Sequence, residues 1–308
     1  VYPDNDCVVC NDKPFRKTYK EFKEECDTTA KGLMALGVEK GSHVAIWATN
    51  YPEWIVLMFA SAKIGATLVT VNTNYKVFEA EYLLKQSDTD TLVMMDGLKD
   101  TNYSEIINEL CPELKDSKPG RMDCENLPYL KRVIYLDAKE NMPRGMLHWS
   151  ELRELAASVS DEALRARQAS VNCHDVVNMQ YTSGTTGFPK GVMLTHYNIL
   201  NNGKCIGDNQ VLTYRDRVCL PVPFFHCFGC VLGIMACITH GSTIVPVERY
   251  HPVRVMHTIQ AERCTATYGV PTMYIAMLEH PDFSKYDFSS LRTGIMSGSP
   301  CPVKVMEQ

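Results

Sequence analysis

The chain has 308 residues, of which 45% are hydrophobic and 22% charged, and its formal net charge is −5. This composition is typical of a globular protein, and the length allows two domains or one large α/β unit. The 31 basic residues are outnumbered by 36 acidic ones, and no basic stripe stands out. A nucleic acid is therefore not expected as a partner.

The sequence gives no sign of export or of a membrane helix. Its first residues have neither a basic start nor an apolar core, so no signal peptide is expected there. Since Met is absent at position 1, we expect the N-terminus of the protein to lie upstream. The longest uncharged run, 218–247, is interrupted by Pro and Gly. It predicts a buried strand, a turn and a core helix instead of a membrane span.

Thirteen cysteines are present, and the odd number argues against a complete disulfide framework. Free thiols in a reducing compartment are the better interpretation. Two CxxC pairs, Cys7–Cys10 and Cys227–Cys230, could together form a zinc site. Their apolar neighbours favour the other interpretation, in which these cysteines are small hydrophobic core residues.

The first half of the chain alternates between strands and helices. Thr18 and Glu21 form a capping box at the start of a helix that Gly37 ends. Further elements are predicted in this order: strand 44–47, helix 54–63, strand 67–71, helix 79–86, and strands 91–95 and 133–136. This alternation predicts an α/β fold with a largely parallel sheet that helices cover on both faces.

The predicted boundary between two subdomains lies near residue 172. Before it, 108–130 reads as a surface loop and 151–168 as one helix. After it, strands are predicted at 176–181, 217–221, 243–246, 265–270 and 291–296, with helices at 195–206, 228–239, 253–261 and 271–280. We therefore expect one α/β subdomain over 1–172 and a second over 173–308.

Residues 181–191 read Tyr-Thr-Ser-Gly-Thr-Thr-Gly-Phe-Pro-Lys-Gly and follow a predicted strand. Glycines let backbone N–H groups point toward one place, hydroxyls add donors, and one Lys adds a positive charge, which suits a polyphosphate. The common GxxxxGK[ST] loop does not match, since Pro189 separates Gly187 from Lys190. A P-loop kinase or ATPase is thus disfavoured. A polar linker is the other interpretation, but an apolar run follows at once.

This motif resembles, almost letter for letter, the phosphate-loop signature of the adenylate-forming (AMP-binding) superfamily. The resemblance implies the large N-terminal domain of an acyl-CoA synthetase, with two mostly parallel sheets flanked by helices. The β- and γ-phosphates of ATP would be held by seven residues: Thr182, Ser183, Gly184, Thr185, Thr186, Gly187 and Lys190. Thr185 would also bind Mg²⁺, together with a Glu that this sequence lacks.

Residues 223–229 resemble the family motif Pro-x-x-Phe-His-x-x-Gly, which implies that Phe225, His226 and Gly229 border and gate the acyl pocket. Without the resemblance, a core histidine with satisfied hydrogen bonds would be the simpler interpretation. Amino-acid-activating relatives tend to carry Asp where this chain has His226. The uncharged wall therefore suggests a plain carboxylic acid as substrate.

Two further segments complete the implied site. Residues 268–273 resemble a segment that lines the acyl pocket through Val270, although Pro271 is equally well explained as a helix start. Residues 297–300 occupy the place of the family's Gly-Gly-Ala-Pro segment, so Gly298, Ser299 and Pro300 would pack against adenine. The chain departs from that pattern at Ser297 and Ser299.

The resemblance implies an acid–thiol ligase that uses ATP, Mg²⁺ and CoA. The apolar run 224–238 favours a medium- or long-chain fatty acid. The alternatives are a nucleotide- or acyl-binding module and an adenylation enzyme that loads a carrier protein. The family's Mg²⁺-binding Glu, its ribose-binding Asp and its C-terminal domain are absent, so we expect this piece alone to be inactive or nearly so. Cytoplasm is the expected location, with the mitochondrial matrix as the alternative if a transit peptide precedes the chain.

Overall fold

The computed structural model describes residues 2–182 and 187–307. The chain divides into two compact units. Unit 1 comprises Val1–Lys23, Asn50–Pro52 and Ile199–Gln308, and unit 2 comprises Glu24–Thr49 and Glu53–Asn198. The boundary that the sequence predicts after residue 172 lies inside unit 2 of this division, because the strand that follows it pairs with a strand from the first half of the chain.

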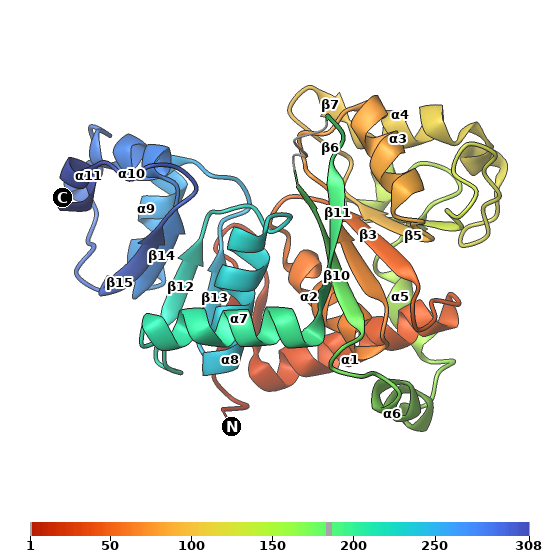
Figure 1. Cartoon of the computed structure of the whole chain (residues 1–308), viewed down its shortest axis with the longest axis horizontal. Helices are drawn as coiled ribbons and strands as arrows, with labels where there is room; N and C mark the ends of the chain where they lie inside the picture. The colour runs from red at the N-terminus through yellow and green to blue at the C-terminus, as the bar shows by residue number, and fades with distance from the viewer. Residues whose placement is uncertain (1, 183–186, 308) are drawn as a thin grey trace. The chain divides into compact units, whose positions relative to one another are not determined.

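Unit 2 is built on a seven-stranded sheet with the order β11-β10-β4-β3-β5-β8-β9. Neighbouring strands are parallel except for the β10–β11 hairpin, which Figure 1 shows as two long adjacent arrows. The strands are β3 (His43–Trp47), β4 (Thr67–Thr70), β5 (Thr91–Met94), β8 (Arg132–Tyr135), β9 (Leu147–His148), β10 (Val176–Thr182) and β11 (Lys190–Thr195). Almost every residue of β3, β4, β5 and β8 is buried, as expected for a parallel sheet covered on both faces.

The first long helix of the chain begins and ends where local signals predict. The helix α1, whose first five residues belong to unit 1, starts with the predicted capping box: Thr18 N–H donates to Glu21 at 2.8 Å, and Glu21 N–H donates to the Thr18 hydroxyl at 3.2 Å. Gly37 follows it with φ +84°. The helical segments are α1 (Tyr19–Ala35), α2 (Pro52–Lys63), α3 (Val77–Gln86), α4 (Tyr103–Leu110), η1 (Pro112–Asp116), η2 (Lys139–Asn141), α5 (Glu151–Ala156) and α6 (Asp161–Ala169), and a small hairpin joins β6 (Gly97–Leu98) to β7 (Thr101–Asn102).

Unit 1 contains a six-stranded sheet with the order β15-β14-β12-β13-β1-β2, parallel except between β1 and β2. Its strands are β1 (Asp6–Val9), β2 (Arg16–Thr18), β12 (Arg217–Leu220), β13 (Thr243–Pro246), β14 (Ala266–Gly269) and β15 (Thr293–Met296). Its helical segments are α7 (His196–Asn209), η3 (Phe228–Met235, π-helical), α8 (Ala236–His240), α9 (Pro252–Ala261), α10 (Pro271–Leu278), η4 (Phe283–Lys285) and α11 (Val303–Glu307). The α/β class with two mostly parallel sheets is therefore confirmed.

Three local predictions were wrong. The stretch 108–130 is not simply a surface loop, because it contains the end of α4 and η1, and Leu114 and Leu127 are buried. The predicted helix 151–168 is two helices, since the Ser160 hydroxyl accepts from Ala163 N–H at 3.1 Å and starts α6 as a new helix. The strand β11 was not predicted, because the pattern after the phosphate motif favours a chain that leads directly into a helix.

The cysteines are not all free. Cys111 and Cys124 form a disulfide in unit 2, contrary to the expectation of free thiols, and eleven others are free. Among the described residues no cluster of three or more His, Cys, Asp or Glu could hold a metal ion. None of the helices that the structure describes is long and apolar enough to span a bilayer.

Candidate active site

The described residues of the phosphate motif lie at the end of β10 and the start of β11 in unit 2. Thr182 is the last residue of β10 and lies opposite Lys190, the first residue of β11. Both are exposed. The predicted phosphate-binding residues Ser183, Gly184, Thr185 and Thr186, and with them the predicted Mg²⁺ contact of Thr185, lie outside the described residues.

Gly187 is exposed and has φ +94°, a backbone conformation that side chains disfavour. A Cβ added there would meet no heavy atom within 4 Å. The exposed backbone N–H of Gly187, the Thr182 hydroxyl and the Lys190 ammonium group are three hydrogen-bond donors, one of which is a cation. Such a set suits an anion with several oxygens.

The remaining predicted site residues belong to unit 1, where they follow three neighbouring parallel strands. His226 comes after β12, Val270 directly follows β14, and Gly298 comes shortly after β15. Because these strands are parallel, their carboxyl ends lie at the same edge of the sheet, the usual place for a ligand in an α/β fold. A Cβ on Gly298 would lie 3.0 Å from Cγ1 of Val270, so these two predicted residues are in contact. Gly298, Ser299 and Pro300 are exposed.

The turn that carries Phe225 and His226 closes on Pro223. His226 N–H donates to the Pro223 carbonyl at 3.3 Å, and Gly229 N–H donates to the His226 carbonyl at 2.9 Å. A Cβ on Gly229 would lie 2.3 Å from the Pro223 carbonyl oxygen, so the turn requires glycine at this position. Phe225 is half-buried on the same turn, and Gly229 is fully buried beneath it.

The His226 ring has a defined tautomer. Phe228 N–H donates to its Nδ1 at 3.1 Å, so Nδ1 must be the unprotonated nitrogen and Nε2 carries the hydrogen in the neutral ring. Desolvation by the surrounding protein lowers the pKa of His226, although the residue as a whole is exposed. At neutral pH the His226 ring is therefore uncharged, and its Nε2–H can donate a hydrogen bond to a carboxylate oxygen.

Asn50 is a residue that the sequence analysis missed. Its side chain is buried in unit 1, where Nδ2 lies 3.3, 2.9 and 3.1 Å from the carbonyl oxygens of Leu220, Val222 and Val247. Its Oδ1 accepts from Phe224 N–H at 3.0 Å. Asn50 thus holds the backbone between β12 and the His226 turn. Only its polar character just after an apolar strand could have drawn attention to it.

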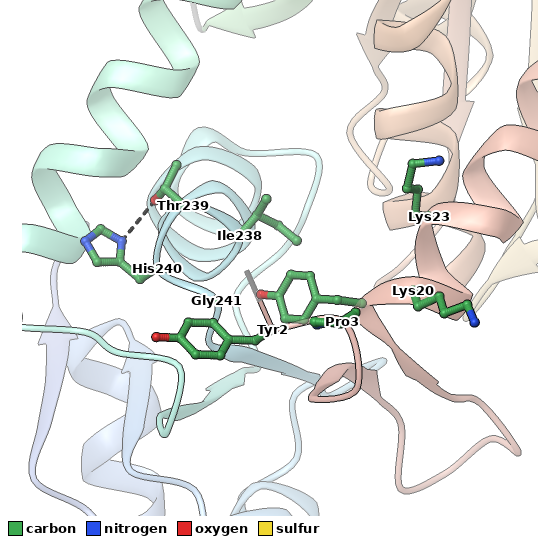
Figure 2. A pocket seen from close by; sticks show the side chains of 9 residues that line it. Tyr2, Pro3, Lys20, Lys23, Ile238, Thr239, His240 and Gly241 are labelled. Carbon is green, nitrogen blue, oxygen red and sulfur yellow. Dashed lines mark hydrogen bonds between the residues drawn. The ribbon is translucent and has the colours of Figure 1, made fainter.

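Two cavities in unit 1 lie away from these residues. One, of about 600 Å³, lies between the start of α1 and the end of α8, and Figure 2 shows Lys20 and Lys23 on one side of it and the hydrogen-bonded pair Thr239–His240 on the other. The other, of about 420 Å³, has an apolar lining that includes β15 and α10. None of the predicted site residues that the structure describes lines either of these two cavities.

The fold is that of the large domain found in solved acyl-CoA synthetases and related enzymes. The N-terminal domain of FACL13 from Mycobacterium tuberculosis matches 99% of this chain with a TM-score of 0.79 at 24% identity, and 69% of that domain is covered. The anthranilate CoA ligase AuaEII matches 99% of the chain with a TM-score of 0.79 at 23% identity, and 53% of it is covered. At these identities the likeness concerns the fold.

The family model described as "AMP-binding enzyme" matches residues 1–308, and the chain belongs to this family. It is 55% identical over 307 residues to YngI of Bacillus subtilis (strain 168), which is named as a provisional acyl-CoA synthetase. It is 38% identical over 310 residues to the mitochondrial medium-chain acyl-CoA ligase ACSF2 of Danio rerio. Each match covers 100% of this chain but only 56% and 51% of the respective relative, so the chain spans about half the length of these relatives.

Proposed function

We propose that this chain is part of an ATP-dependent acid:CoA ligase whose substrate is a medium- or long-chain fatty acid. In the first step, the carboxylate would attack the α-phosphorus of ATP and release pyrophosphate. In the second, the thiol of CoA would displace AMP and form the thioester. The observation that carries this proposal is the family match over residues 1–308, together with relatives named as acyl-CoA synthetases and ligases.

The described residues fit this chemistry at two places. Thr182, Gly187 and Lys190 offer a hydroxyl, an accessible backbone and a cation to the terminal phosphates of ATP. His226 offers a neutral N–H donor to the acid, and Phe225, Gly229 and Val270 would form the wall of the acyl pocket. Gly298, Ser299 and Pro300 would contact adenine. When bound, Mg²⁺ would neutralise phosphate charge, and Thr185 would be this chain's contribution to holding it.

The chain length of the acid is inferred from two observations. The segment after β12 is apolar and buried over most of η3, which favours an aliphatic group. Relatives named for a chain length include the medium-chain acyl-CoA ligases ACSF2 of Danio rerio and Homo sapiens. We therefore favour a medium-chain acid within the proposed class. The cytoplasm stays the predicted location, with the mitochondrial matrix as the alternative.

The test is acid-dependent exchange of pyrophosphate into ATP by the full-length protein, with saturated fatty acids of increasing length. We expect exchange to peak with a medium-chain acid, and we expect the 308-residue chain alone to show little or none. Lys190→Ala should lower the exchange rate by about 100-fold, the usual cost of removing one preorganised group that stabilises transition-state charge. The control is Lys204→Ala, which removes an exposed Lys of α7 that pairs with Asp208.

The result that would overturn the proposal is no exchange with any acid in the full-length wild type, whereas wild-type exchange in the Lys190→Ala variant would overturn only the role assigned to Lys190. Thioester formation with CoA then separates the ligase from an enzyme that loads a carrier protein. If the full-length protein binds ATP and a fatty acid without making acyl-adenylate, the alternative of a binding module is favoured.

A further inference from the structure

The helix α3 contacts the limb of the phosphate motif that carries Lys190. The Tyr82 hydroxyl on α3 donates a hydrogen bond to the Pro189 carbonyl at 3.1 Å. The Phe188 ring lies beside α3 as well, with its centroid 5.2 Å from that of Tyr82 and 6.4 Å from that of Phe78. Three α3-facing contacts therefore fall on the two residues that immediately precede Lys190.

The other limb is attached to the same helix. The Tyr181 hydroxyl forms a hydrogen bond with the side chain of Gln86 at the end of α3. Across the hairpin, Tyr181 lies opposite Gly191, and a Cβ on Gly191 would approach the Tyr181 ring to 3.2 Å. One helix of unit 2 thus contacts both described limbs of the motif, one through Phe78 and Tyr82 and the other through Gln86.

The helix α3 is itself firmly placed. Its first turn is fixed by a bond from Lys76 N–H to the Glu79 carboxylate at 3.0 Å, and one face is buried through Ala80, Leu83 and Leu84. A helix anchored in this way moves little. The two limbs of the motif that contact α3 are therefore held against a helix that packs in the core of unit 2.

Two of the aromatic side chains in these contacts, Phe78 and Phe188, remain largely exposed, whereas Tyr82 is half-buried. The exposed fractions are 65% for Phe78 and 52% for Phe188, so the contact buries little apolar surface. Gly187, just before Phe188, has a left-handed φ, and no heavy atom of the described residues lies within 4 Å of where its Cβ would be. The contacts to α3 are therefore suited to setting where the limb lies, more than to stabilising the fold.

We propose that Tyr82 and Phe188 are positioning residues that hold Lys190 in place for the terminal phosphates of the nucleotide. This inference rests on the proposed function, because it assigns to α3 the placement of a cation that would bind ATP. It implies a specific kinetic signature. Loss of either contact should weaken the apparent affinity for ATP and leave that for the acid unchanged, since the acyl residues lie in unit 1.

The experiment uses the full-length protein with the variants Tyr82→Phe and Phe188→Ala. We expect the KM for ATP to rise about 5-fold in Tyr82→Phe, the factor that corresponds to one hydrogen bond, and by a similar or larger factor in Phe188→Ala. The KM for the fatty acid and the thermal unfolding midpoint should stay at their wild-type values. Phe188→Tyr keeps the aromatic ring, so its KM for ATP should be close to that of the wild type and below that of Phe188→Ala. Tyr129→Phe, at an exposed tyrosine of the same unit, is the control.

Hydrogen exchange of the backbone amides of Phe188, Lys190 and Gly191 without nucleotide gives a second readout that does not depend on activity. We expect it to be about 5-fold faster in Tyr82→Phe than in Tyr129→Phe, by the same free-energy difference. Unchanged exchange would overturn the inference, and so would faster exchange with an unchanged KM for ATP. If these variants behave as the wild type while Lys190→Ala is impaired, the positioning role falls and the proposed function stands. If the wild type has no acid-dependent activity, both fall.

Discussion

Replacing Asn50 tests whether one buried amide holds the backbone beneath the His226 turn. The side chain is 5% exposed, and its NH₂ group, with two hydrogens, serves three carbonyl oxygens at 2.9 to 3.3 Å. Its Oδ1 is the acceptor for Phe224 N–H. Asn50→Ala removes two donated bonds and one accepted bond and leaves that N–H unsatisfied. At roughly 1 kcal/mol for each bond and 1–3 kcal/mol for the stranded N–H, the expected loss of unfolding free energy is about 4–6 kcal/mol.

Asn50→Asp is the sharper variant because it keeps the shape and the acceptor. Near neutral pH, however, a carboxylate oxygen would face the carbonyl oxygens of Leu220, Val222 and Val247 with no hydrogen to donate. Burial and these oxygens should raise the pKa of the new carboxyl in the folded state above its unfolded value of about 3.9. The folded state then binds more protons than the unfolded state between these two pKa values. The variant should therefore regain stability as the pH falls from 7 toward 5.

The assay is urea unfolding followed by circular dichroism at pH 7 and pH 5, with hydrogen exchange at the Phe224 amide as the local readout. Asn202→Ala, at an exposed Asn of α7, is the matched control and should change stability by less than about 0.5 kcal/mol. The reasoning would be refuted if Asn50→Asp were as stable as the wild type at pH 7. It would also be refuted if its stability relative to the wild type did not improve at pH 5.

Three further predictions concern the same unit. Because the pKa of His226 is lowered in the folded state, the unfolding free energy should decrease as the pH falls below about 6.5, the pKa of an unfolded His. In urea titrations at several pH values, His226→Asn should reduce this dependence of the unfolding free energy on pH. Arg292→Ala should cost about 3 kcal/mol in urea unfolding, because the buried Asp216 carboxylate loses the cation that binds it at 2.8 and 2.7 Å and keeps, among the described residues, only hydrogen bonds from Thr213 and Thr265. A loss below about 1 kcal/mol would show that the pair is dispensable. Gly229→Ala should destabilise the protein by about 1–3 kcal/mol, because the added Cβ would overlap a backbone carbonyl. Gly187→Ala has open space around it and should cost only about 1 kcal/mol of backbone strain. Equal shifts in melting temperature for the two variants would contradict this.

The alternation of strands and helices was predictable because it depends on local chemistry. Apolar runs such as 67–70 and 91–94 form buried parallel strands, and the capping box at Thr18 starts α1 where expected. Predictions failed where one local signal competed with another. Ser160 starts a new helix inside a helical pattern, and β11 became a strand because β10 offered it an unpaired edge.

The motif residues were also identified from the sequence, but their surroundings were not. Nothing local indicates that Tyr82, on a helix about a hundred residues earlier, would bond to Pro189. The same holds for Asn50, which reaches carbonyl groups about 170 to 200 residues away. The Cys111–Cys124 bond likewise depends on how the chain after α4 returns to that helix.

By itself, the sequence determined the α/β class, the order of most elements and the glycine- and hydroxyl-rich motif that ends at Lys190, because periodicity, capping and turn chemistry act over a few residues. Only the tertiary structure decided which strands became neighbours. That pairing brings Val270 against Gly298, and the folded unit 2 attaches both limbs of the phosphate motif to α3. The physical reason is that side chains distant in sequence meet only after the sheets have formed, and the hydrogen bonds between them have no signature in the local sequence.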